Sequence, residues 1–499
     1  MASGTVNDMG YLDVYVPNGG NSSRSVRTAW LGLNREKPQD AGVLSEASNI
    51  SVRDLPYLRT APLAETLRQL DGEVHGIFDV GDGAYVAVTQ TWVEGGFSYL
   101  WLWYFKDDIA ASCAFSMITS VIPTSVVPFN VYTEYDSNVV GSTYERKILV
   151  FPQCLSFTPP TVSGTFTVEP FNTTKNPVPQ LPYTVVHMGR LWGVKDGKFY
   201  ASGWNDYSDW SLPNADDLDG DVSQFPWVSA TQSDVNADGD FTAIAVYDNH
   251  VIGFKKSYMH MIYNNKNPFR IVDVAKVGAL SQKAVCECNQ ILFFVGEDGV
   301  YAFTGGYPER ISDALELSSY EGAVLGADEV TLYCAIPGDG VYTFDTVNRA
   351  WGRYVGRMER EMPIQCATVG GKCLYAASSG GSPVVKSFGG ENYGISFSFD
   401  TDATYGGQLV EKRLKRLRLQ AVHNHHAEGD FLKVSLISSP EGKVVMCKTL
   451  TPAGDGTFVL SSLLRMACDF GHVVRVEGQG DFEIRYLQMD YTAGGERYV

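Results

Sequence analysis

The chain has 499 residues and a formal net charge of −18, because 57 Asp and Glu outnumber 39 Lys and Arg. Hydrophobic residues make up 44% of it, enough for an extensive core, which excludes an intrinsically disordered protein. The acidic balance also argues against a protein that grips nucleic acid mainly by neutralising its phosphates.

Signals for export and membrane insertion are missing from the sequence. The first 20 residues lack the basic stretch and apolar stretch of a secretory signal, and no run of 18 apolar residues occurs. Nine cysteines, an odd number, are scattered without CxxC pairs, which does not fit a disulfide framework. We therefore expect free thiols, no membrane span and synthesis in a reducing cytoplasm.

Residues 1–72 are predicted to form an N-terminal arm. Most of this segment is polar and rich in Gly, Ser and Asn, so it is a poor candidate for a core of its own. A short helix is expected over residues 60–70, because Leu63, Leu67 and Leu70 share one helical face.

Residues 73–390 are predicted to form a β-propeller. An apolar strand, a Gly-containing turn and a second strand of the form Val-Tyr-x-Phe recur along this stretch, as at Asp298-Gly299-Val300-Tyr301. Copies begin at residues 249, 289, 328 and 370, and their spacings of 40, 39 and 42 residues match the length of a four-stranded blade. With further copies near residues 81 and 189, the sequence predicts about six blades.

The pattern changes over residues 391–499, where about six longer strands alternate between apolar and polar residues. Strands of this kind predict an antiparallel β-sandwich. The basic run over residues 412–418 alternates imperfectly with leucines, which favours a solvated strand face over a nucleic-acid patch. The expected fold is therefore all-β, with an N-terminal arm, a propeller and a C-terminal sandwich.

Two polar segments are candidate metal sites. In the first, Asp234, Asn236 and Asp238 match the first half of a calcium loop, with Gly239 at the sixth position. However, Ala245 stands at the twelfth position, where a bidentate Glu is needed. An ordinary polar turn fits this segment as well.

The second candidate is His423-Asn424-His425-His426, since imidazoles bind transition metals. A polar loop between two sandwich strands is the plainer explanation. The sequence contains no Walker A loop, dinucleotide fingerprint, Gly-x-Ser-x-Gly or His-Glu-x-x-His motif. It therefore assigns no catalytic residue and predicts no cofactor.

Three stretches together carry a resemblance to a known family. They are residues 31–34 with 47–50 and 55–62, residues 189–192 with 200–204 and 209–210, and residues 239–312, which include Gly239-Asp240-Phe241-Thr242 and Arg310-Ile311-Ser312. Taken together, they resemble the β-propeller tail and head-completion proteins of tailed bacteriophages. These are also described as tail nozzle or hub proteins, or as packaged-DNA stabilisation proteins.

The resemblance implies a structural virion protein and no catalytic residues. Proteins of this family form a ring, usually of six copies, that continues the DNA channel below the portal and its adaptor. Such a ring retains the packaged genome and conducts it during ejection without sequence-specific binding. Residues 204–240, the N-terminal arm and the sandwich are the expected contacts with neighbouring subunits.

Two other classes of propeller compete with this interpretation. A glycan-binding or glycan-cleaving propeller, as in a tail fibre or a lectin, would present exposed aromatic platforms beside carboxylates. Trp204, Trp210 and Trp227 are the candidates for such a platform. An intracellular scaffold propeller would show stricter blade periodicity and Trp-Asp signatures, which this sequence lacks.

Overall fold

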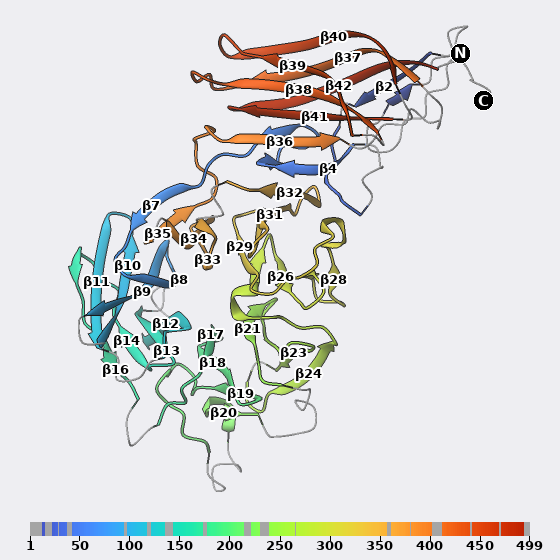
Figure 1. The fold of residues 1–499 in the computed structure, drawn as a ribbon. Coiled ribbons are helices and arrows are strands. Elements are labelled where there is room, and N and C mark those ends of the chain that lie inside the picture. The colour runs from blue at the N-terminus through green and yellow to red at the C-terminus, as the bar shows by residue number, and fades with distance from the viewer. Residues whose placement is uncertain are drawn as a thin grey trace.

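The computed structural model is all-β, as predicted, with 59% of the described residues in strands. The ribbon shows a ring of small sheets and, at one end of it, a stack of longer strands (Figure 1). No helix among the described residues is long and apolar enough to cross a bilayer. The residues described are 12–14, 22–27, 29–36, 42–93, 97–116, 121–134, 143–172, 177–213, 221–229, 239–264, 266–356, 361–379, 381–401, 412–439, 442–468 and 471–493.

The ring is a propeller of seven blades, each with four antiparallel strands. The first three blades are β8–β11 (Glu73–Gly81, Ala84–Val93, Phe97–Lys106, Ile109–Ser116), with β15 (Gly164–Thr165) at its edge; β12, β13, β14 and β16 (Ser125–Glu134, Thr143–Phe151, Leu155–Phe157, Glu169–Pro170); and β17–β20 (Tyr183–His187, Arg190–Lys195, Lys198–Ala201, Trp227–Val228). The fourth and fifth blades are β21–β24 (Ala243–Tyr247, His250–Phe254, Met259–Tyr263, Arg270–Ala275) and β25–β28 (Val285–Cys288, Ile291–Val295, Val300–Phe303, Glu309–Arg310). The last two blades are β29–β32 (Val324–Ala327, Thr331–Ile336, Gly340–Asp345, Ala350–Tyr354) and β33–β35 (Gln365–Val369, Lys372–Ser379, Ser382–Ser387) with β7 (Glu65–Gln69). The first strands of successive blades adjoin one another, and β33 of the last blade adjoins β8 of the first, so the ring is closed.

The structure therefore has one blade more than the repeat predicted. Four of the six sequence copies are hairpins of the second and third strands of a blade, whereas the copies near residues 81 and 370 lie at the turn between the first and second strands. The blade without a copy is the second, whose hairpin turns at residues 152–154 and contains no Asp-Gly pair. Cys154 supplies the positive φ there, at 55°. The repeat was missed because this turn is built from different residues.

The helix predicted over residues 60–70 is wrong, because β7 is a strand that completes the last blade. Its residues pair antiparallel with β35, from Glu65 opposite Ser387 to Gln69 opposite Val384. Leu67 packs against the apolar cluster between the last and first blades, and Leu70 is buried there. The free edge of β35 offers backbone partners that local helix propensity cannot match.

The longer strands form two facing sheets, a β-sandwich. One sheet is ordered β3 (Gly32–Leu33), β4 (Val43–Ser48), β36 (Ser396–Thr401), β41 (Gly471–Gln479), β38 (Phe431–Ser439), β39 (Val444–Leu450). The other sheet contains β40 (Gly456–Cys468), β37 (Lys412–His423) and β42 (Phe482–Ala493), in that order. The far edge of β42 pairs with β2 (Ser22–Arg27) and with β6 (Leu58–Thr60). Strand β2 pairs in turn with β1 (Leu12–Val14). Buried side chains such as Leu417, Leu419, Val434 and Leu436 share one core between them.

The N-terminal segment is thus not an arm of its own. Its strand β4 pairs with β36, and its strands β2 and β6 pair with β42, nearly the whole chain length away. Three short strands cannot bury a core alone, so they complete sheets whose other strands come from the C-terminal part of the chain. In the basic run, Leu414 and Leu417 are buried and Lys415 is exposed, as expected for a strand with one solvated face.

The sandwich and the propeller are connected by hydrogen-bonded strands. Strand β5 (Ile50–Ser51) pairs with β6 of the sandwich, and Ile50 also pairs with Arg353 of β32. The sixth blade and one sandwich sheet consequently form one continuous sheet of 11 strands.

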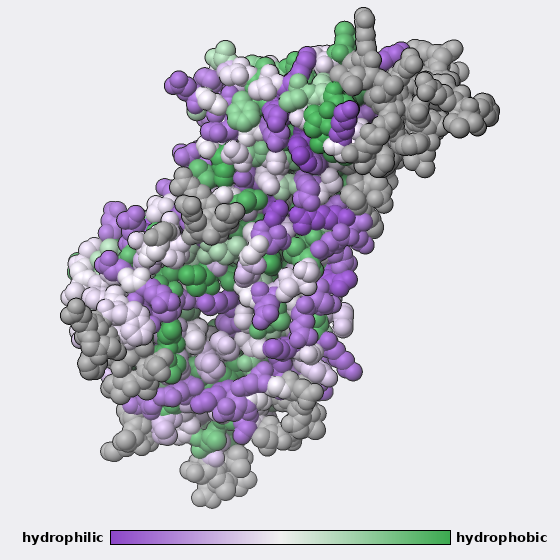
Figure 2. All heavy atoms as spheres, viewed as in Figure 1, coloured by the Kyte–Doolittle hydropathy of each residue, from purple (hydrophilic) through white to green (hydrophobic). Residues whose placement is uncertain are grey.

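Short 3₁₀ helices lie in connections, at η1 (Val222–Gln224), η3 (Gln282–Ala284) and η4 (Asp313–Leu315). On the face shown in Figure 2, hydrophilic residues lie over both bodies with hydrophobic residues scattered between them.

Candidate functional site

Asn49 joins the propeller to the sandwich. It is 4% exposed and adopts a φ of 58°, a left-handed conformation that Asn tolerates better than most residues. Its Nδ2 donates to the Ser396 carbonyl oxygen at 2.7 Å, and its Oδ1 accepts from the backbone N–H groups of Val355 and Gly356 at 2.8 and 2.9 Å. One amide side chain therefore satisfies backbone groups on both bodies.

Arg59 forms a second contact near the same junction. Its Nε and Nη2 donate to the two carboxylate oxygens of Asp481 at 3.1 and 2.9 Å, a bidentate geometry. Nδ1 of His425 lies 2.7 Å from the same carboxylate. Burial acts to raise the pKa of Asp481, but the hydrogen bonds from Arg59 and His425 hold that pKa below its usual value. The Arg59 guanidinium also lies over the ring of Tyr393, 5.3 Å from its centroid.

A cleft of about 1010 Å³ lies between the last blade and the sandwich, beside these contacts. On its propeller side Lys386 forms a buried ion pair with Glu361, which also accepts a hydrogen bond from Ser379 at 2.7 Å. Its sandwich side is lined by His425, His426, Asp430 and Asp481. Glu361 and Asp481 are each bound to a cation within the chain, which favours a structural role for them over proton transfer.

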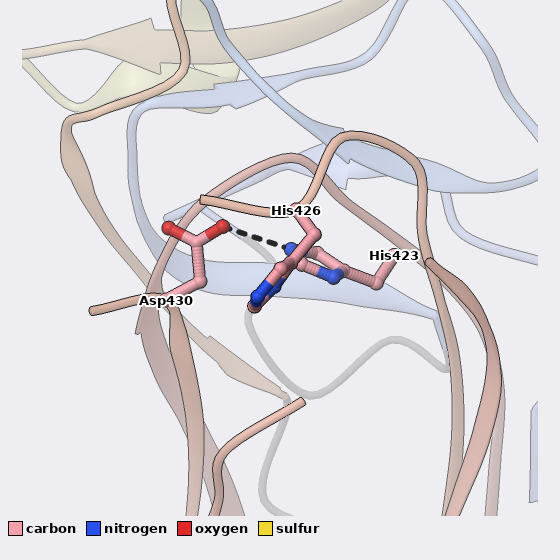
Figure 3. Close-up of side chains that lie close together, drawn as sticks. All are labelled: His423, His426 and Asp430. Carbon is pink, nitrogen blue, oxygen red and sulfur yellow. Dashed lines mark hydrogen bonds and ion pairs between the residues drawn. The ribbon is translucent and has the colours of Figure 1, made fainter. Parts of the chain in front are cut away.

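The loop between β37 and β38 brings His423, His426 and Asp430 together at the edge of this cleft. One ligand atom of each lies within 4.8 Å of the others (Figure 3). His425 is excluded from this cluster because its ring bonds to Asp481. The sequence pointed to the histidines and missed Asp430, although its place in the same loop, in a His-x2-His-x3-Asp pattern, was an available signal.

Arg190, in the second family-like stretch, has a structural role inside the third blade. It is 2% exposed, and its guanidinium donates to the backbone carbonyls of Ser202, Ser223 and Phe225. Burial lowers the pKa of Arg190 to about 10. Arg190 thus binds backbone groups at the start and near the end of the segment that connects β19 to β20, and holds both against the blade.

The third family-like stretch is held by surface polar contacts. Asp298 accepts a hydrogen bond from the Tyr301 hydroxyl at 2.7 Å and lies 3.3 Å from Nη1 of Arg310. Arg310 also pairs with Asp313 at 2.6 Å. These contacts connect the Asp-Gly turn of the fifth blade to the strand that follows it.

The calcium candidates Asp234, Asn236 and Asp238 lie outside the described residues. Asp240, just after them, is described, and its Oδ1 accepts from the backbone N–H groups of Gly197 and Phe241 at 2.8 and 2.7 Å. That carboxylate therefore fastens the end of the segment to the neighbouring blade.

The three candidate tryptophans do not form a shared platform. Trp204 is 53% exposed, whereas Trp210 is partly buried in one apolar cluster and Trp227 in another. Trp227 packs against Trp192 and Phe269, with ring centroids 6.1 and 5.3 Å apart. The aromatic platform expected of a glycan-binding propeller is not formed by these residues.

The eight cysteines whose side chains are described are all free thiols. Burial raises the pKa of Cys154 and of Cys288 to about 12. These two thiols therefore stay protonated at neutral pH and act as small buried apolar groups.

A scan against protein-family models and a search of curated proteins find no match for this chain. Solved structures similar to it include YCF48 bound to a D1 peptide, with 9% identity over 66% of this chain and 97% of that chain and a TM-score of 0.39. BamB from Moraxella catarrhalis is 11% identical over 69% of this chain and 96% of its own, with a TM-score of 0.35. The Dos1 propeller is 11% identical over 67% and 97%, with a TM-score of 0.36. Likenesses this weak carry no argument about function.

Proposed function

We propose that this chain is a non-enzymatic structural protein of a bacteriophage tail, a subunit of the nozzle, hub or head-completion ring that conducts the genome out of the head. One observation carries the proposal. Residues in the family-like stretches, namely Asn49, Arg59 and Arg190, use their side chains to hold the fold together. A structural role of this kind is expected for these residues if the sequence likeness reflects a part of the fold that this chain shares with the family.

Backbone pairing between the two bodies supports a mechanical role. The sheet of the sixth blade continues through β5 into the sandwich, and β7 closes the propeller ring. A load on one body therefore passes to the other through hydrogen-bonded strands. A channel wall that holds a packaged genome needs this kind of rigidity.

The charge of the chain suits a channel for DNA. Six copies at −18 each would carry about −108, and a negative wall repels phosphates. DNA would then pass without binding sites that slow it. The partners in this proposal are further copies of the chain, the portal with its adaptor, other tail proteins and the passing genome, all in the virion.

The proposal is tested by locating the chain in virions produced by the genome that encodes it. Quantitative mass spectrometry should find about six copies per particle, the number usual for such a ring. Gold-labelled antibody should mark the tail. Infectious, DNA-filled virions that lack the chain would overturn the proposal.

A further inference from the structure

The loop between β37 and β38 presents three ligand groups of the kinds that hold transition metals. His423 ends β37, His426 follows in the loop, and Asp430 precedes β38. His423 and Asp430 are 1% and 3% exposed, while His426 is exposed and lines the cleft. A single loop therefore carries two buried ligands and one accessible one.

His423 stands between two acceptors. Its Nδ1 lies 3.2 Å from the Gly454 carbonyl oxygen, and its Nε2 lies 3.0 Å from Oδ2 of Asp430 (Figure 3). A carbonyl can only accept, so the Nδ1 proton belongs to that bond. Nε2 then directs its lone pair toward Oδ2 of Asp430, and a metal ion between these two atoms would be bound by both.

The surroundings are those of a metal ligand. A histidine that binds a metal commonly donates its other N–H to a backbone carbonyl, which fixes the tautomer and the ring orientation, as Gly454 does here. Oδ2 of Asp430 accepts from the Ala427 N–H at 2.8 Å, and the His426 N–H donates to Asp455 at 2.6 Å. These contacts hold the loop backbone, and Oδ2 of Asp430 keeps a second lone pair for a metal ion.

The distances suit a tetrahedral ion. Metal–nitrogen and metal–oxygen bonds of about 2.0–2.2 Å place two tetrahedral ligands roughly 3.3 Å apart. Nε2 of His423 and Oδ2 of Asp430 are 3.0 Å apart, and all three ligand atoms lie within 4.8 Å, so small side-chain rotations suffice.

We propose that His423, His426 and Asp430 bind one divalent transition metal ion, with zinc the best fit to two imidazoles and a carboxylate. Three protein ligands leave a fourth position for water on the side of the cleft. The ion fastens the loop across the sandwich end of the cleft. This site is independent of the tail assignment.

The test uses the full chain, stripped with a chelator and titrated with ZnCl₂ by calorimetry, with elemental analysis after gel filtration. One zinc per chain is expected. His426→Ala, at an exposed position that should not disturb folding, should weaken zinc binding at least about tenfold. Asp430→Asn should do the same, and Co²⁺ in the native site should show the visible bands of a tetrahedral complex.

His425→Ala is the matched control, because His425 is the neighbouring exposed imidazole and bonds to Asp481 instead. It should keep one zinc per chain. Absence of stoichiometric zinc from the native chain would overturn the proposal. Equal losses in the His425 and His426 variants would also overturn it, since zinc would then be bound by surface histidines in general.

Discussion

At the scale of single residues, a few polar side chains form the hydrogen bonds at the junction between the propeller and the sandwich. Asn49, Arg59 and Thr60 lie within twelve positions of each other, and each binds a group far away in the sequence. The Thr60 hydroxyl, for example, donates to the Gly480 carbonyl at 3.0 Å and accepts from the Phe482 N–H at 3.2 Å. Sequence alone marked this stretch as family-like, but its partners could not be predicted, because nothing local specifies a contact some 400 residues away.

Replacing Asn49 should weaken the junction. Asn49→Gly keeps the left-handed backbone and removes three hydrogen bonds of a buried side chain to backbone groups of both bodies, so the free energy of unfolding should fall by about 2–4 kcal/mol. Denaturant unfolding measures the change. Asn289→Gly is the control, because Asn289 has a φ of 48° but is exposed and makes one side-chain bond, to Thr346. Equal losses in both variants would contradict the role given to Asn49.

The ionisation of Asp481 should make the free energy of unfolding depend on pH. Its pKa is held below the usual value, so its contribution is complete above the unfolded-state pKa of about 3.9 and is lost as pH falls through the folded-state pKa. Asp481→Asn should cost about 1–3 kcal/mol at pH 7. The difference from the native chain should shrink as pH drops below about 4, as followed by unfolding at a series of pH values.

The control for Asp481 is Asp82, a 56% exposed carboxylate that pairs with Arg146. Exposed pairs contribute little, so Asp82→Asn should change the unfolding free energy by less than about 1 kcal/mol. A loss from Asp481→Asn that stays constant from pH 7 to pH 3 would mean that the residue acts by packing rather than by charge.

At the scale of elements, local patterns predicted strands well and their partners poorly. The repeat revealed six of the seven blades, and four of its six copies contain an Asp-Gly pair, residues that tolerate the positive φ of tight turns. The hairpin of the second blade was missed because Cys154 takes that role. The helix predicted over residues 60–70 failed because pairing with β35 decides the state of β7. In the candidate metal site, the sequence indicated the histidines but not Asp430, because a single carboxylate in a loop has many ordinary explanations.

The closing strand offers a direct test of ring closure. Leu67→Asp in β7 places a charge in the apolar cluster between the last and first blades, so it should lower the melting temperature by several degrees, a loss of about 2–3 kcal/mol. Gln69→Asp, at an exposed position of the same strand, should change it little. Calorimetry compares the two. Identical melting of both variants would mean that β7 does not help to close the propeller.

At the scale of the whole molecule, the chain begins in the sandwich, closes the propeller with one strand, runs around seven blades and returns to the sandwich. Each body is therefore completed by strands from distant parts of the sequence. The division into arm, propeller and sandwich expected from composition gave the right kinds of fold. It misplaced the first 72 residues, whose strands have no repeat or core of their own to reveal where they belong.

The proposed tail function predicts how the purified chain assembles. Its mass and negative-stain shape should be measured alone and after mixing with the portal–adaptor assembly of the same phage. The account predicts a ring of about six subunits with a central hole, formed either alone or on the connector. A chain that stays a 54.7 kDa monomer under both conditions and leaves the connector bare would contradict it.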